Sequence, residues 1–199
     1  EVHVPVSKEL LMDFASMRVS YGKMFYNVGK IIKRKSPPLE EIKECLSCYG
    51  NVSNVKKCLN ISSVLRLIQN ECSLTNIALL HSVVEELNIT EAEEHIKTYK
   101  AELKEFCKSL SISLRLKERF ASIPHLQCQG VTFLLSRMPE RHILDDIENI
   151  LRELVQDEKK NIWMQVITPV TVEPVMEEIS AKVSNSILGN CRISNILHL

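Results

Sequence analysis

Three cysteines come closest, by residue type and spacing, to a recognisable chemical site. Cys45, Cys48 and Cys58 have the spacing of a zinc knuckle, but Ser53 stands where a knuckle has histidine. Serine is a poor zinc ligand, a structural zinc site needs four good ligands, and only the distant Cys72 could be the fourth. We therefore expect most of these cysteines to be small buried hydrophobes, with a zinc-dependent nucleic-acid binder as one alternative.

The same cysteines do not fit a redox site. Cys45 and Cys48 would lie one helical turn apart, without the preceding strand that a thioredoxin-like motif requires. The chain has 7 cysteines, an odd number, at irregular spacings. This pattern favours reduced thiols over a disulfide framework, so we expect a cytoplasmic protein.

Other residues with chemical potential are isolated from one another. His81 has Glu85 four residues later but no further partner, and the dispersed glycines form no phosphate-binding loop. Asp145 and Asp146 are adjacent, so on a helix they point apart, and we expect them to enrich its first turn. Trp163 is predicted to be core. The sequence thus predicts no catalytic, cofactor-binding or metal-binding residue. The alternative hypothesis is an enzyme, whose unrecognised site would lie in the C-terminal α/β part of the chain.

The charge balance excludes a protein-wide field for nucleic acids or membranes. Lysine plus arginine and aspartate plus glutamate each number 25. The densest basic cluster, Lys30–Lys35, precedes Ser36-Pro37-Pro38, where a helix should end and cations complement its dipole. No apolar run approaches the ~20 residues of a membrane span. We therefore predict that the chain binds no nucleic acid and no membrane. No small-molecule substrate is predicted either.

The clearest periodic element is a helix from Leu10 to Ile32. One stripe repeats at alternating intervals of four and three residues, which is typical of a helix packed in a bundle. Gly22 and Gly29 lie seven apart on another face, where they cost helix stability but permit close approach. The stripe consists of Leu10, Phe14, Met17, Tyr21, Met24, Val28 and Ile31.

Four more helices are predicted before residue 120. The first of them begins at Pro38. Asn60 and Ser73 are expected to cap the next two, and Thr90 and Glu93 to form a capping box at the start of the fourth. The sequence therefore predicts a bundle of about five helices over residues 7–119.

After Pro124 the pattern changes to alternating strands and helices. Strands are predicted at 131–135, 162–167 and 191–196, with helices at about 143–154 and 173–185 between them. The predicted fold is thus mostly α, with a small α/β unit at 128–197 docked on the bundle.

Several stretches resemble an accessory region found beside death domains in multidomain signalling proteins of simple animals such as sponges. They are Ile89–Lys100, Leu103–Leu110, Cys128–Phe133, Leu144–Ile147 and Gly189–Ile193, within residues 10–196. The resemblance implies a scaffold module of apoptotic or innate-immune signalling that works through protein–protein contacts. No six-helix death domain is evident in these residues. The function we expect is a non-enzymatic protein-interaction module, with protein partners and no cofactor.

Overall fold

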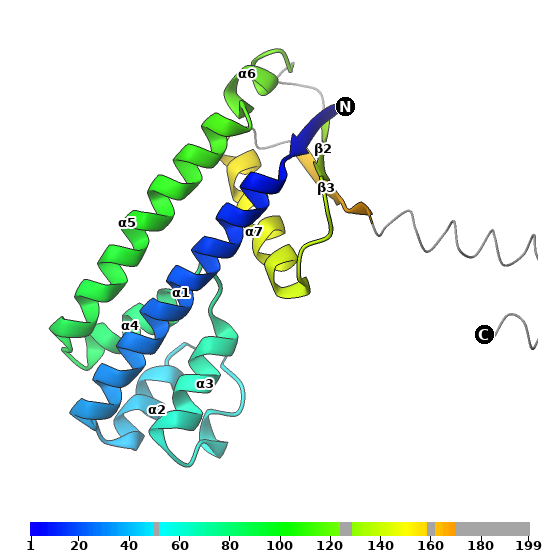
Figure 1. Cartoon of the computed structure of the whole chain (residues 1–199). Coiled ribbons are helices and arrows are strands. Elements are labelled where there is room, and N and C mark those ends of the chain that lie inside the picture. The colour runs from blue at the N-terminus through cyan, green and yellow to red at the C-terminus, as the bar shows by residue number, and fades with distance from the viewer. Residues whose placement is uncertain (50–51, 124–128, 159–161, 170–199) are drawn as a thin grey trace, which may run out of the picture.

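A computed structural model describes residues 1–49, 52–123, 129–158 and 162–169. These residues form a mostly helical molecule with a small parallel sheet at one end (Figure 1). The helix predicted at 173–185 and the strand predicted at 191–196 lie outside the described residues. The elements are β1 (Val2–Val6), α1 (Lys8–Lys35), α2 (Leu39–Ser47), the 3-10 turn η1 (Val55–Lys57), α3 (Ile61–Glu71), α4 (Ala78–Glu86), α5 (Thr90–Ser113), α6 (Leu116–Ala121), β2 (Gln129–Leu135), α7 (Arg141–Glu158) and β3 (Ile162–Ile167).

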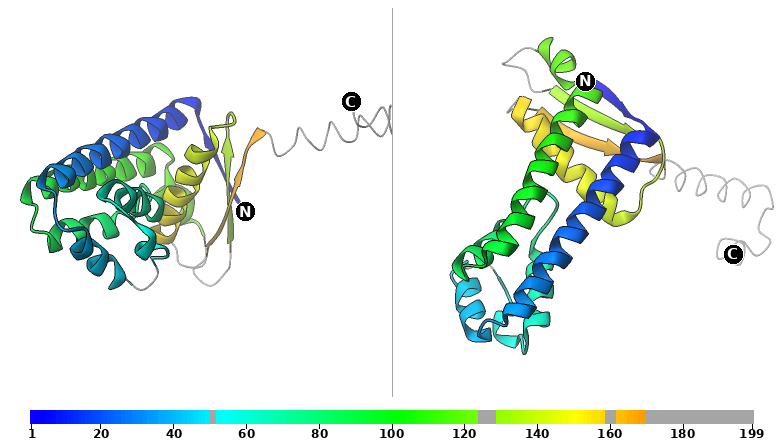
Figure 2. Two further views of the ribbon diagram at one scale, coloured as in Figure 1. Left: turned by 90° about the horizontal axis from the view of Figure 1, so that it is seen from below. Right: turned by 60° about the vertical axis from the view of Figure 1, so that its left-hand side comes forward.

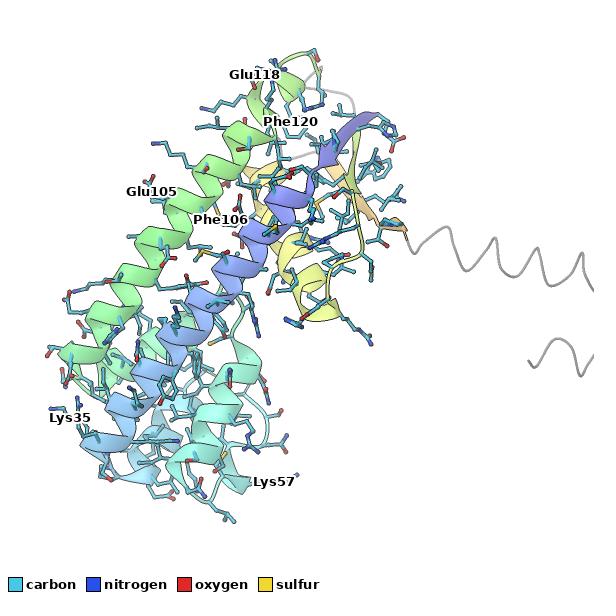
Figure 3. The ribbon with its side chains drawn as sticks, in the orientation of Figure 1. Lys35, Lys57, Glu105, Phe106, Glu118 and Phe120 are labelled. Carbon is cyan, nitrogen blue, oxygen red and sulfur yellow. The ribbon has the colours of Figure 1, made fainter. Side chains whose placement is uncertain are left out.

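Helix α1 is the central element of the bundle and confirms the prediction of a long packed helix. Ser7 caps its first turn, and Lys33, Arg34 and Lys35 occupy its last turn, where cations complement the helix dipole. The predicted stripe faces the interior, chiefly against α5. The Phe14 and Phe106 rings meet edge to face at 5.3 Å, and in Figure 3 Phe106 lies on the side of α5 toward α1.

The remaining helices confirm the bundle but correct three of its boundaries. Asn60 and Ser63 form a true capping box at α3. Ser73 does not cap a helix, because residues 73–76 close a turn by backbone hydrogen bonds and α4 begins only at Ala78. Thr90 is already the first residue of α5 and its side chain makes no capping hydrogen bond. The predicted last helix breaks at Arg115, whose φ of 53° is left-handed, so α6 is separate.

The sheet is parallel, with the order β1-β2-β3. Strands β2 and β3 lie where the sequence predicted them. Strand β1 was not predicted, and it brings the N-terminal residues into the α/β unit, with Val4 beside Phe133. The left view of Figure 2 shows the sheet nearly edge-on, with α1, α5 and α7 on one of its sides.

Side chains alternate between the two faces of the sheet. Val4, Val131 and Phe133 point toward the helices and are buried. Trp163 points the other way and is 48% exposed, so the expectation that it is core was wrong. Its ring covers Gly130 so closely that a Cβ at that glycine would lie 2.1 Å from Trp163 Cζ2. Glycine at position 130 is therefore required by the close approach of the indole.

Candidate partner-binding groove

Helix α1 carries a second apolar stripe, opposite the one that faces the bundle. Met12, Val19 and Tyr26 recur every seven residues and are 54%, 56% and 65% exposed. Ala15, Gly22 and Gly29 alternate with them at intervals of three and four. Single exposed hydrophobic residues are ordinary, whereas three in line along one helix form a contiguous apolar strip.

Two hollows adjoin this stripe on the same flank of α1. The first, of about 440 Å³, is lined by Met12, Ala15 and Val19 together with Met138 and His142. The second, of about 320 Å³, has α1 as one wall and α3 as the other. Its lining includes Gly22, Tyr26, Gly29, Ser62, Leu65 and Arg66. Figure 1 shows α7 and α3 on the same side of α1. Because Val19 and Gly22 are one turn apart, the hollows follow each other along the helix; we call them together the α1 groove.

The charged residues that line the α1 groove are mostly cations. The first hollow contributes Arg18 and Arg137, with His142 beside them, and Glu140 is its one acidic lining residue. Lys30, Lys33 and Arg66 line the second hollow. The Glu140 carboxylate lies 3.3 Å from His142 Nε2, and Lys30 Nζ lies 4.7 Å from the centre of the Tyr26 ring. A neutral chain thus carries a local positive field along an apolar strip.

The two glycines of the stripe differ in their surroundings: Gly22 is exposed, whereas Gly29 is buried. A Cβ at Gly22 would meet nothing within 4 Å. One at Gly29 would meet Leu65 Cδ1 at 3.5 Å, an ordinary van der Waals contact. Each glycine costs a helix interior about 0.5–1 kcal/mol relative to alanine. At Gly22 the missing side chain leaves an open, smooth patch on the exposed side of α1.

Arg18 connects the groove to a buried carboxylate. Its Nη1 lies 3.6 Å from Asp146 Oδ2, and its guanidinium lies 5.0 Å from the centre of the Tyr21 ring. Asp146 is only 4% exposed, and its Oδ2 accepts no hydrogen bond from any residue that the structure describes. The expectation that both adjacent aspartates enrich the first turn of a helix was wrong, because α7 begins at Arg141 and Asp146 faces the interior. This ion pair holds Arg18 at the floor of the first hollow.

Burial raises the pKa of Asp146, and the nearby Arg18 charge offsets that effect only in part. The neighbouring Tyr21 hydroxyl is also buried without a hydrogen-bond partner among the described residues, and burial raises its pKa to about 12. A carboxyl whose pKa is higher in the folded state binds more protons there than in the unfolded chain. Its contribution to stability is therefore present below its unfolded pKa and is lost as pH rises through the folded pKa.

Replacing Asp146 by Asn should remove this pH dependence. We expect D146N to gain stability relative to the native chain as pH rises from about 4 to 7, since Asn keeps the shape without the buried charge. The measurement is the free energy of unfolding in urea at several pH values for both proteins. A difference that stays constant with pH would show that Asp146 titrates as it does in the unfolded chain.

The residues singled out from the sequence are not brought together. Cys45 is half-buried, Cys48 is exposed and Cys58 is buried with its Sγ 3.8 Å from Asn54 O. Within the described ranges no three His, Cys, Asp or Glu side chains could hold one metal ion. His81 lies between Lys100 Nζ, 2.8 Å from its Nδ1, and Glu85, 3.3 Å from its Nε2, which is an ordinary surface arrangement.

Comparisons with protein-family models, with curated proteins and with solved structures found no match. Among the described residues, no helix is long and apolar enough to cross a membrane. The α1 groove is therefore the candidate functional site.

Proposed function

We propose that this chain is a non-enzymatic protein-interaction module whose α1 groove binds an amphipathic helix of a partner protein. The observation that carries the proposal is the line of Met12, Val19 and Tyr26, exposed along one face of a long helix beside two hollows. Amphipathic helices bind such surfaces by laying apolar residues, spaced three and four apart, into a groove. The exposed Ala15 and Gly22 leave room for the helix backbone.

The charges define the partner helix further. Cations of the groove outnumber acids, so a helix with acidic residues on both sides of its apolar stripe is complementary. Such complementarity mainly favours encounter and orientation, while the apolar contacts supply most of the affinity. A lysine-rich helix of the same apolar pattern would be repelled.

The cellular setting is part of the same proposal. We place the module in the cytoplasm, in a scaffold of the death-domain type. The resemblance of residues 10–196 is the only support for the scaffold, and the irregular cysteine pattern is the support for the compartment. The groove itself does not depend on either.

The proposal can be tested with helices selected from a displayed library of amphipathic helical peptides. We expect the tightest binder, called the probe helix below, to carry more acids than bases and to lose affinity when its acids become lysines. A selection that yields no binder, or only binders whose affinity is unchanged by that exchange, would contradict the proposed groove.

Alanine at position 22 gives a second test, because it should move stability and binding in opposite directions. G22A is expected to stabilise the fold by about 0.5–1 kcal/mol, since the new methyl group meets nothing in the molecule. The same methyl group occupies the floor of the groove, and we expect it to weaken the probe helix about tenfold, as overpacking typically costs 1–3 kcal/mol. Urea unfolding and fluorescence anisotropy measure the two effects.

The matched control is S109A, which replaces an exposed residue of α5 away from the groove. It should stabilise modestly through helix propensity and leave binding unchanged. If G22A gains stability but binds the probe helix like the native chain, the partner backbone does not pass over position 22.

A further inference from the structure

The two outer strands of the sheet differ in how their edges are protected. Ser136 N donates to Val6 O, so the peptide groups of Val6 face β2. Because these groups alternate in direction along a strand, those of His3 and Pro5 face outward. Pro5 has no N–H to donate, and the His3 carbonyl accepts from Arg119 Nη1 at 3.3 Å. The edge of β1 is therefore closed to another strand.

Strand β3 has an edge without such protection. Its six residues, Ile162–Ile167, include no charged residue, no proline and no glycine. Natural sheets usually protect an exposed edge with charges, with proline or with a covering segment. Among the strands that the structure describes, only β2 pairs with β3. The other edge of β3 is therefore a template on which a further strand can pair.

The pairing within the sheet shows which residues of β3 face this edge. Ser136 N donates to β1, so by alternation the peptide groups of Phe133 point to β3. Phe133 lies opposite Val166, and in a parallel pair a residue bonds to the two neighbours of the residue opposite it. The N–H and C=O groups of Val166 therefore point away from β2, and so do those of Met164 and Ile162.

We propose that this edge pairs with β3 of a second copy of the chain, antiparallel and in a register centred on Met164. In that register Met164 lies opposite Met164 of the second copy, and Ile162 lies opposite Val166. Each opposite pair exchanges two hydrogen bonds, so every N–H and C=O group that these three residues present to the edge has a partner. A two-fold axis perpendicular to the sheet produces the arrangement and keeps the helices of both copies on one face.

The side chains of β3 favour the same register. Ile162, Met164 and Val166 point toward the helices but are only half-buried. Phe133, which lies opposite Val166 on β2, is fully buried on that face. In the proposed pair each of the three half-buried side chains meets an apolar side chain of the second copy, which removes more of this row from water. Because β3 is uncharged and the chain has no formal net charge, a second copy meets no electrostatic repulsion.

Amide exchange of the native chain, followed by NMR at low and high protein concentration, tests the pairing. The amides of Met164 and Val166 face the edge, whereas those of Gln165 and Ile167 bond to β2. We expect exchange at Met164 and Val166 to slow about tenfold or more as the mass rises from one chain to two, while exchange at Gln165 and Ile167 stays unchanged.

Three results of this experiment would overturn the inference. The first is a chain that stays monomeric up to high micromolar concentration. The second is a dimer in which the amides of Met164 and Val166 gain no protection. The third is protection of these two amides in a monomer, because the strand that pairs with β3 would then belong to the same chain.

Charges placed at position 164 test the register. M164K and M164E each put like charges directly opposite each other, and each should weaken dimerisation about tenfold or more. An equal mixture of the two variants should dimerise again, because lysine then lies opposite glutamate. The control is Q165K, whose side chain lies on the open face opposite Trp163 of the second copy and should leave dimerisation unchanged. Analytical ultracentrifugation measures the dissociation constants. A mixture that stays monomeric, or a Q165K variant that dimerises as weakly as M164K, would contradict the register.

Discussion

Replacing Val19 by Asp should weaken binding of the probe helix by about 30-fold or more, while the fold keeps its stability. Val19 is central in the α1 groove and more than half exposed. The carboxylate of the V19D variant therefore stays solvated in the free protein. We expect the free energy of unfolding to change by no more than about 0.5 kcal/mol. In the complex the same carboxylate would be buried against an apolar and acidic partner, which costs about 2 kcal/mol or more.

A matched control separates the groove from a general effect of a surface charge. Ile112 is 68% exposed on α5 and lines neither hollow. I112D introduces the same charge in place of a β-branched residue on a helix, and it should bind the probe helix like the native chain. Anisotropy titrations compare the variants. If V19D binds normally, or if I112D loses as much affinity, the α1 groove is not the binding surface.

Truncating Phe133 to Ala should cause the largest loss of stability of the changes considered, about 3–5 kcal/mol. Its side chain is fully buried on the central strand, between Val4 and Val166 of the two neighbouring strands. Removing the ring leaves a cavity in the layer between the sheet and the helices. Urea denaturation followed by circular dichroism measures the loss.

L134A is the matched control, because Leu134 is the next residue of β2 and points to the open face. It should cost less than about 1 kcal/mol. Since α1 contacts both α5 and α7, we also expect the bundle and the sheet of the F133A variant to unfold in one transition. A low-stability transition of the sheet that leaves the helical signal intact would show two independently folding units.

The helical part of the fold was predictable because its signal is local. The stripe of α1 repeats over the whole helix, and the Asn60 cap lies three residues from its partner Ser63. Ser73 failed as a cap for a tertiary reason: Tyr99 Oη donates to Leu74 O at 2.5 Å, which helps hold that segment as a turn. A hydrogen bond between residues so far apart in sequence leaves no local signal.

The sheet was only partly predictable for the same reason. Strand β1 is short and contains Pro5, and its assignment depends on β2, with which it pairs from Val2 at Val131 onward. The alternating exposure of β3 was missed as well, so Trp163 was placed in the core. Asp145 and Asp146 have the residue type expected in the first turn of a helix. Helix α7, however, begins at Arg141, so both lie beyond its first turn and Asp146 is buried.

The sequence carries a signal for the candidate site, of which only one part was recognised. Gly22 and Gly29 were recognised as a pair on a second face of α1, while Met12, Val19 and Tyr26, seven apart on the same side, were not. Their exposure depends on which stripe of α1 packs against α5. The flanking walls come from α3 and from the segment before α7, and no local pattern predicts where those segments lie relative to α1.

Methionine methyl spectra during titration with the probe helix test the α1 groove most directly. Met12 and Met138 line its first hollow, whereas Met17 and Met24 are buried on the opposite side of α1. We predict that the Met12 and Met138 methyl signals shift in proportion to saturation, while those of Met17 and Met24 stay in place. Saturable binding that leaves Met12 and Met138 unshifted would contradict the account.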